Sequence, residues 1–265
     1  KASGFDATMN LSSLDGKNGF RLDVAWNRSV NSAAGDVNGD GFDDVIIGVP
    51  PSGLNGRSSG SSYVVFGKDS GFDATMGLSS LDGSNGFRLD GVAVGDFSGR
   101  SVSSAGDVNG DGFDDVIIGA DGADPFGNNS GSSYVLFGKT SGFDAVINLS
   151  NLDGTNGIRL DGAAKDDNSG RSVSSAGDVN GDGFDDLLVG APEADQNGSS
   201  SGSSYVIFGR SSFVDDIDFP GTPGDDIFTG TSAAEIFEAG DGNDRMIGHG
   251  GADVFHGGAG NDRIR

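Results

Sequence analysis

Three nine-residue segments place side-chain oxygens at intervals that suit a metal ion. They begin at Asp36, Asp107 and Asp178, lie 71 residues apart, and each reads Asp-Val-Asn-Gly-Asp-Gly-Phe-Asp-Asp. Oxygens at positions 1, 3 and 5 can converge on one ion if the backbone curls, and glycine at position 6 permits that curl. A carbonyl at position 7 and a carboxylate at position 9 complete a set of oxygen ligands that suits calcium better than the stricter magnesium. The predicted calcium ligands are Asp36, Asn38, Asp40, Phe42 and Asp44; Asp107, Asn109, Asp111, Phe113 and Asp115; and Asp178, Asn180, Asp182, Phe184 and Asp186.

Two other interpretations of these segments were weighed. The helix-loop-helix calcium hand has a similar opening but closes with Glu at position 12, which here is Ile118, inside a predicted strand. Asn-Gly and Asp-Gly also form hairpin turns without any metal. Three copies that all keep four oxygen side chains favour calcium, because unneutralised carboxylates a few ångströms apart repel by several kcal/mol. The segments are therefore expected to be calcium-binding hairpin loops.

A second repeat, of nine residues, begins at Gly221. Position six holds an acid in every nonad and position eight a large apolar residue, Phe228 in the first nonad and Ile264 in the last. A large apolar side chain every nine residues, between glycine-rich turns, predicts a parallel β-roll that also binds calcium. The predicted metal residues are Asp226, Asp244, Asp253 and Asp262. The first two nonads depart from the pattern at Ala233 and Glu235, which leaves binding there open, and His249 and His256 are interpreted as solvated side chains rather than a transition-metal site.

The acidic loops lie within a larger repeated unit. Each unit has four short apolar runs between Gly, Asp, Asn and Ser, and such runs predict strands; in the second unit they include 86–90, 115–119 and 133–138. Four strands per unit predict β-propeller blades. The expected fold is all-β: a partial propeller of three four-stranded blades over residues 1–214 (about 1–66, 67–137 and 138–214), followed by a parallel β-roll over 215–265.

Segments outside the blades carry fewer signals. The phrase Gly-Phe-Asp-Ala-Thr-Met at Gly4 and Gly71, with a looser copy at Gly142, is expected to be a surface excursion pinned to a blade edge by Phe and Leu, rather than a binding loop. The first unit is four residues shorter before its acidic loop and contains the chain's single Trp. Trp26 is expected to be a buried anchor or a cover of the end blade, rather than a platform for a ligand.

Composition limits the partners of the chain. Its 265 residues include 40 acidic and 16 basic ones, for a net charge of −24. Nucleic acid and anionic membranes both need a basic surface, so neither is an expected partner, and no apolar run reaches the length of a membrane span. The chain has no Cys, which makes metal the expected substitute for disulfides. It begins at Lys1 without Met or a signal peptide, so we expect the sequence to start within a longer gene product.

Two family resemblances follow from these motifs. Gly99-Arg100-Ser101-Val102, the acidic loop and Gly119-Ala120 recur together and resemble FG-GAP repeats, the blade unit of the integrin α-subunit head, over roughly residues 1–214. The namesake Phe-Gly is replaced by Ser98-Gly99 and Ser169-Gly170, which affects strand packing and not the metal loop. Residues 221–265 resemble the RTX nonad arrays of bacterial proteins exported by type I secretion. Together the resemblances imply a calcium-dependent protein that is secreted or displayed on the surface of bacteria.

Two classes of function remain. The first is a calcium-stabilised module for adhesion, binding or surface assembly, with a protein or glycan as ligand. The second is a non-catalytic part of a larger secreted hydrolase. The chain has no Cys, no zinc-type His pair and no Gly-x-Ser-x-Gly motif, so no catalytic or cofactor-binding residue is predicted in it. A regulatory role for calcium stays open. Three blades are too few to close a propeller, so either further blades precede Lys1, which we favour, or copies associate.

Overall fold

The computed structural model describes residues 8–24, 28–51, 58–196, 198–213, 219–232, 235–250 and 254–265. Two compact units make up the chain, Lys1–Phe213 and Val214–Arg265. The regular elements of the described residues are β-strands and short 3-10 helices, which confirms the all-β prediction. Trp26 and the Gly4 phrase up to residue 7 lie outside the described residues, so the predictions made for them stay predictions.

Fourteen strands and three 3-10 helices are described in the first unit. They are β1 (Arg21–Asp23), β2 (Val30–Gly35), β3 (Asp44–Val49), β4 (Ser61–Val65), β5 (Thr75–Gly77), β6 (Gly86–Asp90), β7 (Ser101–Gly106), β8 (Asp115–Ala120), β9 (Ser132–Leu136), β10 (Val146–Asn148), β11 (Gly157–Asp161), β12 (Ser172–Gly177), β13 (Asp186–Ala191) and β14 (Ser203–Ile207), with η1 (Leu11–Ser13), η2 (Leu78–Ser80) and η3 (Leu149–Asn151).

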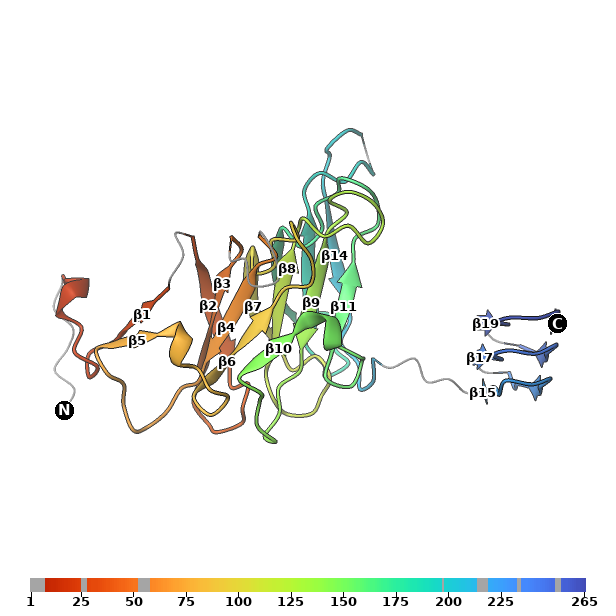
Figure 1. The fold of residues 1–265 in the computed structure, drawn as a ribbon, viewed down its shortest axis with the longest axis horizontal. Coiled ribbons are helices and arrows are strands. Elements are labelled where there is room, and N and C mark those ends of the chain that lie inside the picture. The colour runs from red at the N-terminus through yellow and green to blue at the C-terminus, as the bar shows by residue number, and fades with distance from the viewer. Residues whose placement is uncertain are drawn as a thin grey trace. The chain divides into compact units, whose positions relative to one another are not determined.

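Antiparallel pairing groups most of these strands into three blades. Blade 1 contains β2, β3, β4 and β6, and blade 2 contains β7, β8, β9 and β11. Blade 3 contains β12, β13 and β14. The blades lie face to face in sequence order, with β2, β7 and β12 as neighbours across the blades (Figure 1).

The blade boundaries differ from the predicted limits of 1–66, 67–137 and 138–214. The sequence groups residues 86–90 with the unit that follows them, but this strand pairs with β4 and completes blade 1. In the same way β11 pairs with β9 and completes blade 2. The reason is that β4 and β9 each leave a row of backbone groups to be paired, and the first strand after each excursion returns to that edge. Blade 3 has three strands in the described residues instead of the predicted four.

Apolar side chains pack between the blades rather than inside one barrel. One cluster joins Ile46 and Val64 of blade 1 to Val116 and Ile118 of blade 2. A second joins Ile117 of blade 2 to blade 3. Strand β8 is buried along its entire length, as its continuous apolar sequence predicts for a strand with both faces covered. Blade 2 is therefore the interior layer of the unit.

The excursions clamp neighbouring blades together. Strand β10 lies between β9 and β11 of blade 2 in the sequence, and it pairs in parallel with β6 of blade 1. Phe143 stacks on Phe87 of blade 1 with ring centroids 4.4 Å apart, and Leu149 is buried. Strand β5 pairs with β1 in the same parallel manner. The prediction that Phe and Leu pin the excursions to blade edges is confirmed for the copy at Gly142. In the copy at Gly71, Leu78 packs on blade 1, whereas Phe72 stacks on Phe20, outside the blades.

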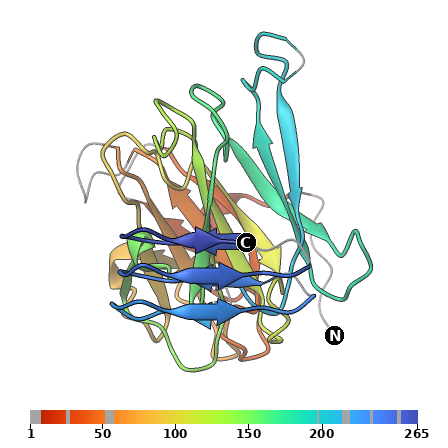
Figure 2. The same cartoon turned by 90° about the vertical axis from the view of Figure 1, so that its right-hand side faces the viewer.

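Short parallel strands make up the second unit. They are β15 (Phe219–Pro220), β16 (Ile227–Thr229), β17 (Ile236–Glu238), β18 (Arg245–Ile247), β19 (Val254–His256) and β20 (Arg263–Ile264). Successive nonads alternate between two sheets, β15-β17-β19 and β16-β18-β20, and the strands stack like rungs (Figure 2). Phe237 and Met246 are fully buried, and Phe237 stacks on Phe255 at 4.8 Å. The predicted β-roll and its apolar interior are confirmed, although Ile264 is exposed.

Candidate calcium-binding loops

Each acidic loop closes a hairpin at the same place in its blade. Loops 1, 2 and 3 (residues 36–44, 107–115 and 178–186) join β2 to β3, β7 to β8 and β12 to β13. A register shift precedes each loop, in the first case between Ala33 and Gly35. Gly35 has a φ of 75°, a value that favours glycine and turns the chain into the loop. The prediction that the loops belong to β-hairpins, and not to helix-loop-helix hands, is confirmed.

Positions 1, 3 and 5 gather on one side of each loop through hydrogen bonds to the backbone. In loop 2 the carboxylate of Asp107 accepts hydrogen bonds from the N–H groups of Gly110, Asp111 and Gly112 at 2.7, 3.1 and 2.9 Å. The Asn109 Oδ1 accepts from the Asp111 N–H at 2.9 Å. Loops 1 and 3 repeat the contacts of Asp36, Asn38, Asp178 and Asn180 with the residues at positions 5 and 6. The structure therefore brings together the first three predicted ligands of every loop.

The position 5 and position 7 residues complete the same turn. The Asp111 Oδ1 accepts a hydrogen bond from the Phe113 N–H at 3.0 Å, and the Asn109 Nδ2 donates to the Asp111 Oδ2 at 3.0 Å. Asp40 and Phe42, and Asp182 and Phe184, are bonded in the same way. The carboxylates at positions 1 and 5 thus lie close together, in a chain whose charge is already strongly negative.

The position 9 carboxylates lie deeper than the others. Asp44, Asp115 and Asp186 are at most 1% exposed. In loop 2 the Asp115 Oδ2 accepts from the Val108 N–H at 3.0 Å, and Oδ1 accepts from the Gly138 N–H at 2.8 Å. Burial, with a smaller contribution from the Asp107 and Asp111 carboxylates, raises the pKa of Asp115 to about 8. The pKa of Asp44 rises to about 7 for the same reasons.

The donor set of the loops fits a calcium ion in type, with hard oxygens from carboxylates and an amide. In the described parts of the chain, however, no three His, Cys, Asp or Glu side chains form a group that could hold a metal ion. In loop 2 both oxygens of Asp107 and of Asp115 accept hydrogen bonds from backbone N–H groups. The Asp-containing turns are consistent with calcium sites, and the individual ligands stay a prediction.

One acidic residue in each loop, at position 8, was not among the predicted site residues. The Asp36 N–H donates to the Asp114 Oδ2 at 2.8 Å, and the Asp114 N–H donates to the Asp36 carbonyl at 3.3 Å. Asp107 and Asp185 make the same reciprocal pair at 3.0 and 3.1 Å. We call this pair the clasp, because it joins two residues 78 positions apart, in the loops of neighbouring blades. The doubled Asp-Asp at the end of every loop is the sequence signal that could have pointed to it.

The acids of the nonads form a ladder in the second unit. The Asp226 N–H donates to the Asp244 Oδ1 at 2.8 Å, and the Asp244 N–H donates to the Asp262 Oδ1 at 3.0 Å. Asp244 is 1% exposed, and its Oδ2 is buried without a hydrogen-bond partner in the described part of the unit. A buried, unbonded carboxylate oxygen is costly without a cation. This column of Asp226, Asp244 and Asp262 fits calcium in its chemistry.

The remaining residues singled out in the nonads do not join this ladder. Asp253 lies outside the described residues, so its predicted role stays a prediction. Glu235 accepts hydrogen bonds from the Thr231 N–H, at 2.7 Å, and from the Thr231 hydroxyl. His249 and His256 are both exposed, in agreement with their interpretation as solvated side chains.

Comparison with known families agrees with this geometry. Residues 30–65, 98–136 and 169–207 match the FG-GAP repeat, and residues 229–264 match the RTX calcium-binding nonapeptide repeat in four copies. The chain carries three FG-GAP repeats followed by an RTX array. Both resemblances drawn from the motifs are confirmed, and the RTX repeats imply that the second unit binds calcium. RTX arrays are typical of secreted proteins, and no helix of the described residues is long and apolar enough to cross a membrane.

Several similar proteins are integrin α subunits. The chain is 33% identical to integrin alpha pat-2 of Caenorhabditis elegans over 189 residues, which is 68% of this chain and 14% of that protein. It is 30% identical to integrin alpha-PS5 of Drosophila melanogaster over 168 residues, 61% of this chain and 14% of the other. Phosphatidylinositol-glycan-specific phospholipase D of Dictyostelium discoideum is 27% identical over 220 residues, 77% of this chain and 21% of the enzyme. The chain thus spans less than a quarter of each of these proteins.

Proposed function

We propose that this FG-GAP and RTX repeat protein is a calcium-stabilised bacterial module, secreted or held at the cell surface, that acts in adhesion, binding or surface assembly. Its ligand would be a protein or a glycan. The observation that carries the proposal is the placement of the acidic loops. Each loop closes a hairpin, and loops 1 and 2 also clasp the loop of the next blade. A calcium ion held there would brace both the blade and the contact between blades.

The ions would be held by the oxygens of positions 1, 3, 5, 7 and 9 in each loop, and by the Asp226, Asp244 and Asp262 column of the RTX array. Calcium would supply the positive charge that lets these carboxylates crowd in a chain of net charge −24. Extracellular calcium modules bind in the range of about 10⁻⁴–10⁻³ M. This range supports a structural role in a calcium-rich medium over a regulatory one.

An adhesion assay tests the proposal. The full chain would be immobilised and offered intact bacterial and animal cells, extracellular-matrix proteins and a glycan array, in calcium and in EDTA. We expect retention of a ligand in calcium and its loss in EDTA, because the blade surface that would carry the binding site depends on the loops. Equal retention in both conditions would contradict a calcium-dependent binding module.

The likeness to a phospholipase D supports a second candidate function. The chain would then be a non-catalytic part of a larger secreted hydrolase, and the blades would serve the enzyme's other domain. Under either proposal the chain itself is not an enzyme. A panel of ester, phosphodiester and glycoside substrates tests this, with turnover by the purified chain as the contrary result. Binding of a surface ligand by the isolated chain would favour the adhesion module.

A further inference from the structure

The two end blades of the first unit carry complementary halves of an interface that the chain forms twice internally. In blade 1, Val37, Ile46 and Val64 are fully buried against blade 2, and Phe66 is 6% exposed. Their counterparts in blade 2 are equally buried against blade 3. The counterparts in blade 3 are exposed, with fractions of 57% for Val179, 37% for Leu188, 49% for Val206 and 54% for Phe208. We call these four residues the open face.

The polar part of the interface is open at the same place. Loop 3 carries the position 1 half of the clasp, but in the described residues no carboxylate accepts from the Asp178 N–H. A Cβ at Gly39 or Gly110 would collide with the position 7 Phe of the next blade, whereas a Cβ at Gly181 would meet nothing within 4 Å. The part of loop 3 that the loop of a following blade would contact is therefore uncovered.

Blade 1 carries the matching half. Asp43 occupies position 8 of loop 1, and its carboxylate is exposed and accepts no hydrogen bond from a described group. Its counterparts Asp114 and Asp185 are half-buried in clasps. Phe42 is 42% exposed, whereas Phe113 and Phe184 lie against the preceding loop. The first blade is thus equipped to clasp a loop that no blade among the described residues provides.

The same two ends also differ by one strand. The outer strands β6 and β11 read Gly-Phe-Arg-Leu-Asp and Gly-Ile-Arg-Leu-Asp, and residues 19–23 read Gly-Phe-Arg-Leu-Asp again. Within this third copy, β1 pairs with β5 of the excursion and with no blade of the described chain. Blade 3, in turn, ends at β14 without an outer strand in the described residues. One end has an outer strand without a blade, and the other has a blade without an outer strand.

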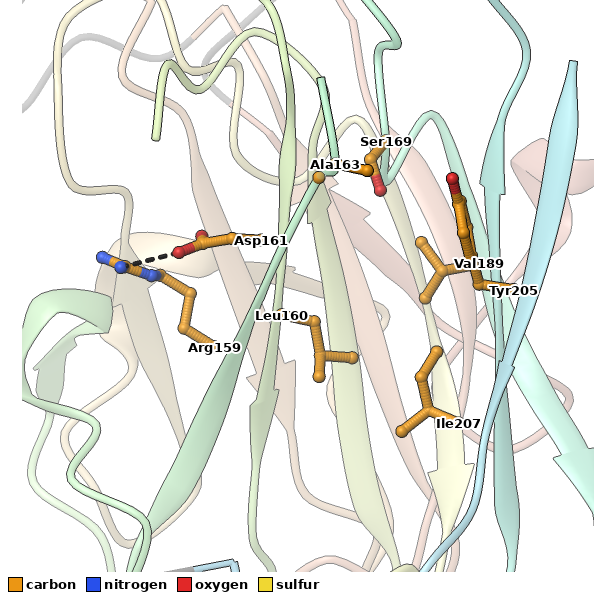
Figure 3. A pocket seen from close by; sticks show the side chains of 9 residues that line it. Arg159, Leu160, Asp161, Ala163, Ser169, Val189, Tyr205 and Ile207 are labelled. Atoms are coloured by element: carbon orange, nitrogen blue, oxygen red, sulfur yellow. Dashed lines mark hydrogen bonds and ion pairs between the residues drawn. The ribbon is translucent and has the colours of Figure 1, made fainter. Parts of the chain in front are cut away.

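Cavities mark the two vacant places. At blade 3 a cavity of about 290 Å³ is lined by Leu160, Val189, Tyr205 and Ile207, whose side chains face it from β11, β13 and β14 (Figure 3). At blade 1 a cavity of about 490 Å³ is lined by Phe20 and Leu22 on one side and by Val45 and Ile47 on the other. The first lies where an outer strand of blade 3 would pack. The second lies beside β1, whose Leu22 packs on blade 1, over the face of blade 1 that a preceding blade would cover.

We propose that a second copy of this chain fills both places, in a head-to-tail association. Blade 3 of one copy would seat against blade 1 of the other, and residues 19–23 of that other copy would become its outer strand. The register follows from blade 1, in which Ser62 pairs with Leu89 and Val64 with Phe87. It places Ser204 opposite Leu22 of the partner copy. Asp23 would accept from Ser203, as Asp90 accepts from Ser61 at 3.2 Å and Asp161 from Ser132 at 2.9 Å.

This association is heterologous, because a different surface of each copy enters the contact. A heterologous contact closes into a ring or continues into a filament, depending on the rotation between copies. Two copies would supply six blades, which is within the range of roughly four to eight found in closed propellers. The contact would repeat the geometry already present between blades 1 and 2 and between blades 2 and 3. Because six blades fall within the range of closed propellers, we expect closure as a dimer.

The first test is the mass of the full chain in calcium, by sedimentation velocity over a range of concentration. We expect a dimer, and we expect Val206→Asp to give a monomer, because it buries a charge in the open face. Val94→Asp is the matched control, since Val94 is also exposed, at 66%, but belongs to the segment that links β6 of blade 1 to β7 of blade 2 and not to the open face. Circular dichroism checks that each variant is folded. A monomeric parent chain, or equal association of parent and Val206→Asp, would overturn the proposal.

The second test fixes the register and does not depend on how tightly the copies bind. The chain has no Cys, so chains carrying Ser204→Cys can be mixed with chains carrying Leu22→Cys and oxidised. We expect a disulfide between these two chains, because directly opposite strand residues lie within disulfide reach. Arg21→Cys is the control, since a shift of one residue points the thiol to the other face of the strand. Equal cross-linking by both partners, or none by Leu22→Cys, would rule out the proposed strand pairing.

Discussion

The blades and the nonad array both repeat a calcium motif, but they distribute stability differently. In the first unit the acidic loops lie at the ends of hairpins, and the large apolar clusters between the blades take only one residue each from them, Val37 and Val108. In the second unit the described core is Phe237, Ala239 and Met246, with Phe228 and Phe255 beside them, and the acids stand in the turns that connect the rungs. From this difference we expect calcium to brace a fold in one unit and to make a fold possible in the other.

Removal of calcium is expected to have the largest effect, and it should change the stability of the two units differently. In EDTA we expect the RTX array to lose its strands, because ion binding contributes directly to folding in a unit with so small a core. The blades should stay folded but melt at a lower temperature. Calorimetry with far-ultraviolet circular dichroism would follow both transitions. A melting transition of the RTX array that is unchanged by EDTA would contradict the comparison.

A core truncation in the blades tests the other half of the comparison. Ile117→Ala should destabilise the first unit by about 2–5 kcal/mol, because it leaves a cavity in a fully buried layer. The loss should be similar with and without calcium. Val94→Ala is the control and should change stability by less than about 0.5 kcal/mol. Denaturant unfolding measures both, and a loss from Ile117→Ala that calcium restores would mean that the core is not independent of the ions.

The clasp offers a pair of substitutions at equivalent positions. Asp114→Ala removes a carboxylate that accepts from the Asp36 N–H, and we expect a loss of about 1–3 kcal/mol from the unpaired group. Asp43→Ala removes the same residue from loop 1, where no described group donates to it, and should cost almost nothing in a monomer. Both are best measured in chains that also carry Val206→Asp, which prevents association. Equal losses would show that position 8 acts within its own loop and not between blades.

The smallest expected effect is the loss of one ion. Asp111→Ala should remove the site of loop 2 and leave loops 1 and 3 occupied, so titration calorimetry should find one calcium fewer per chain. At millimolar calcium the stability lost with a site of extracellular affinity is about 1 kcal/mol. Asp69→Ala, an exposed acid in an excursion, is the control and should keep every site. An unchanged stoichiometry for Asp111→Ala would refute the assignment of loop 2.

Sequence periodicity predicted most of the fold for a physical reason. Strands, turns and the β-roll depend on local patterns, and these recur visibly in each copy. The assignment of 86–90 to the wrong blade shows the limit of that reasoning. A 71-residue sequence repeat has no fixed starting point, so the sequence alone does not show where one blade ends. The pairing of β6 with β4 in the structure shows it.

The sequence predicted part of the candidate site, as it predicted part of the fold. Positions 1, 3 and 5 were found because their spacing is short and local, and the hairpin placed them together. The clasp was missed because Asp114 contacts a loop 78 residues away, and identical copies do not tell which copy a side chain contacts. The deep burial of Asp115 was missed as well, since it depends on the neighbouring strand that supplies the Gly138 N–H.

The offset between repeat and blade has a consequence for how such a chain can grow. Each sequence unit brings the outer strand of the blade before it, as β6 completes blade 1 and β11 completes blade 2. Duplication or loss of one whole 71-residue unit therefore leaves every internal blade with four strands. The last blade of the array remains the one without its outer strand. Unequal crossing-over between near-identical copies would change the number of blades without creating a defect in the middle of the array. The vacancy always stays at the terminus, where a strand from elsewhere can occupy it.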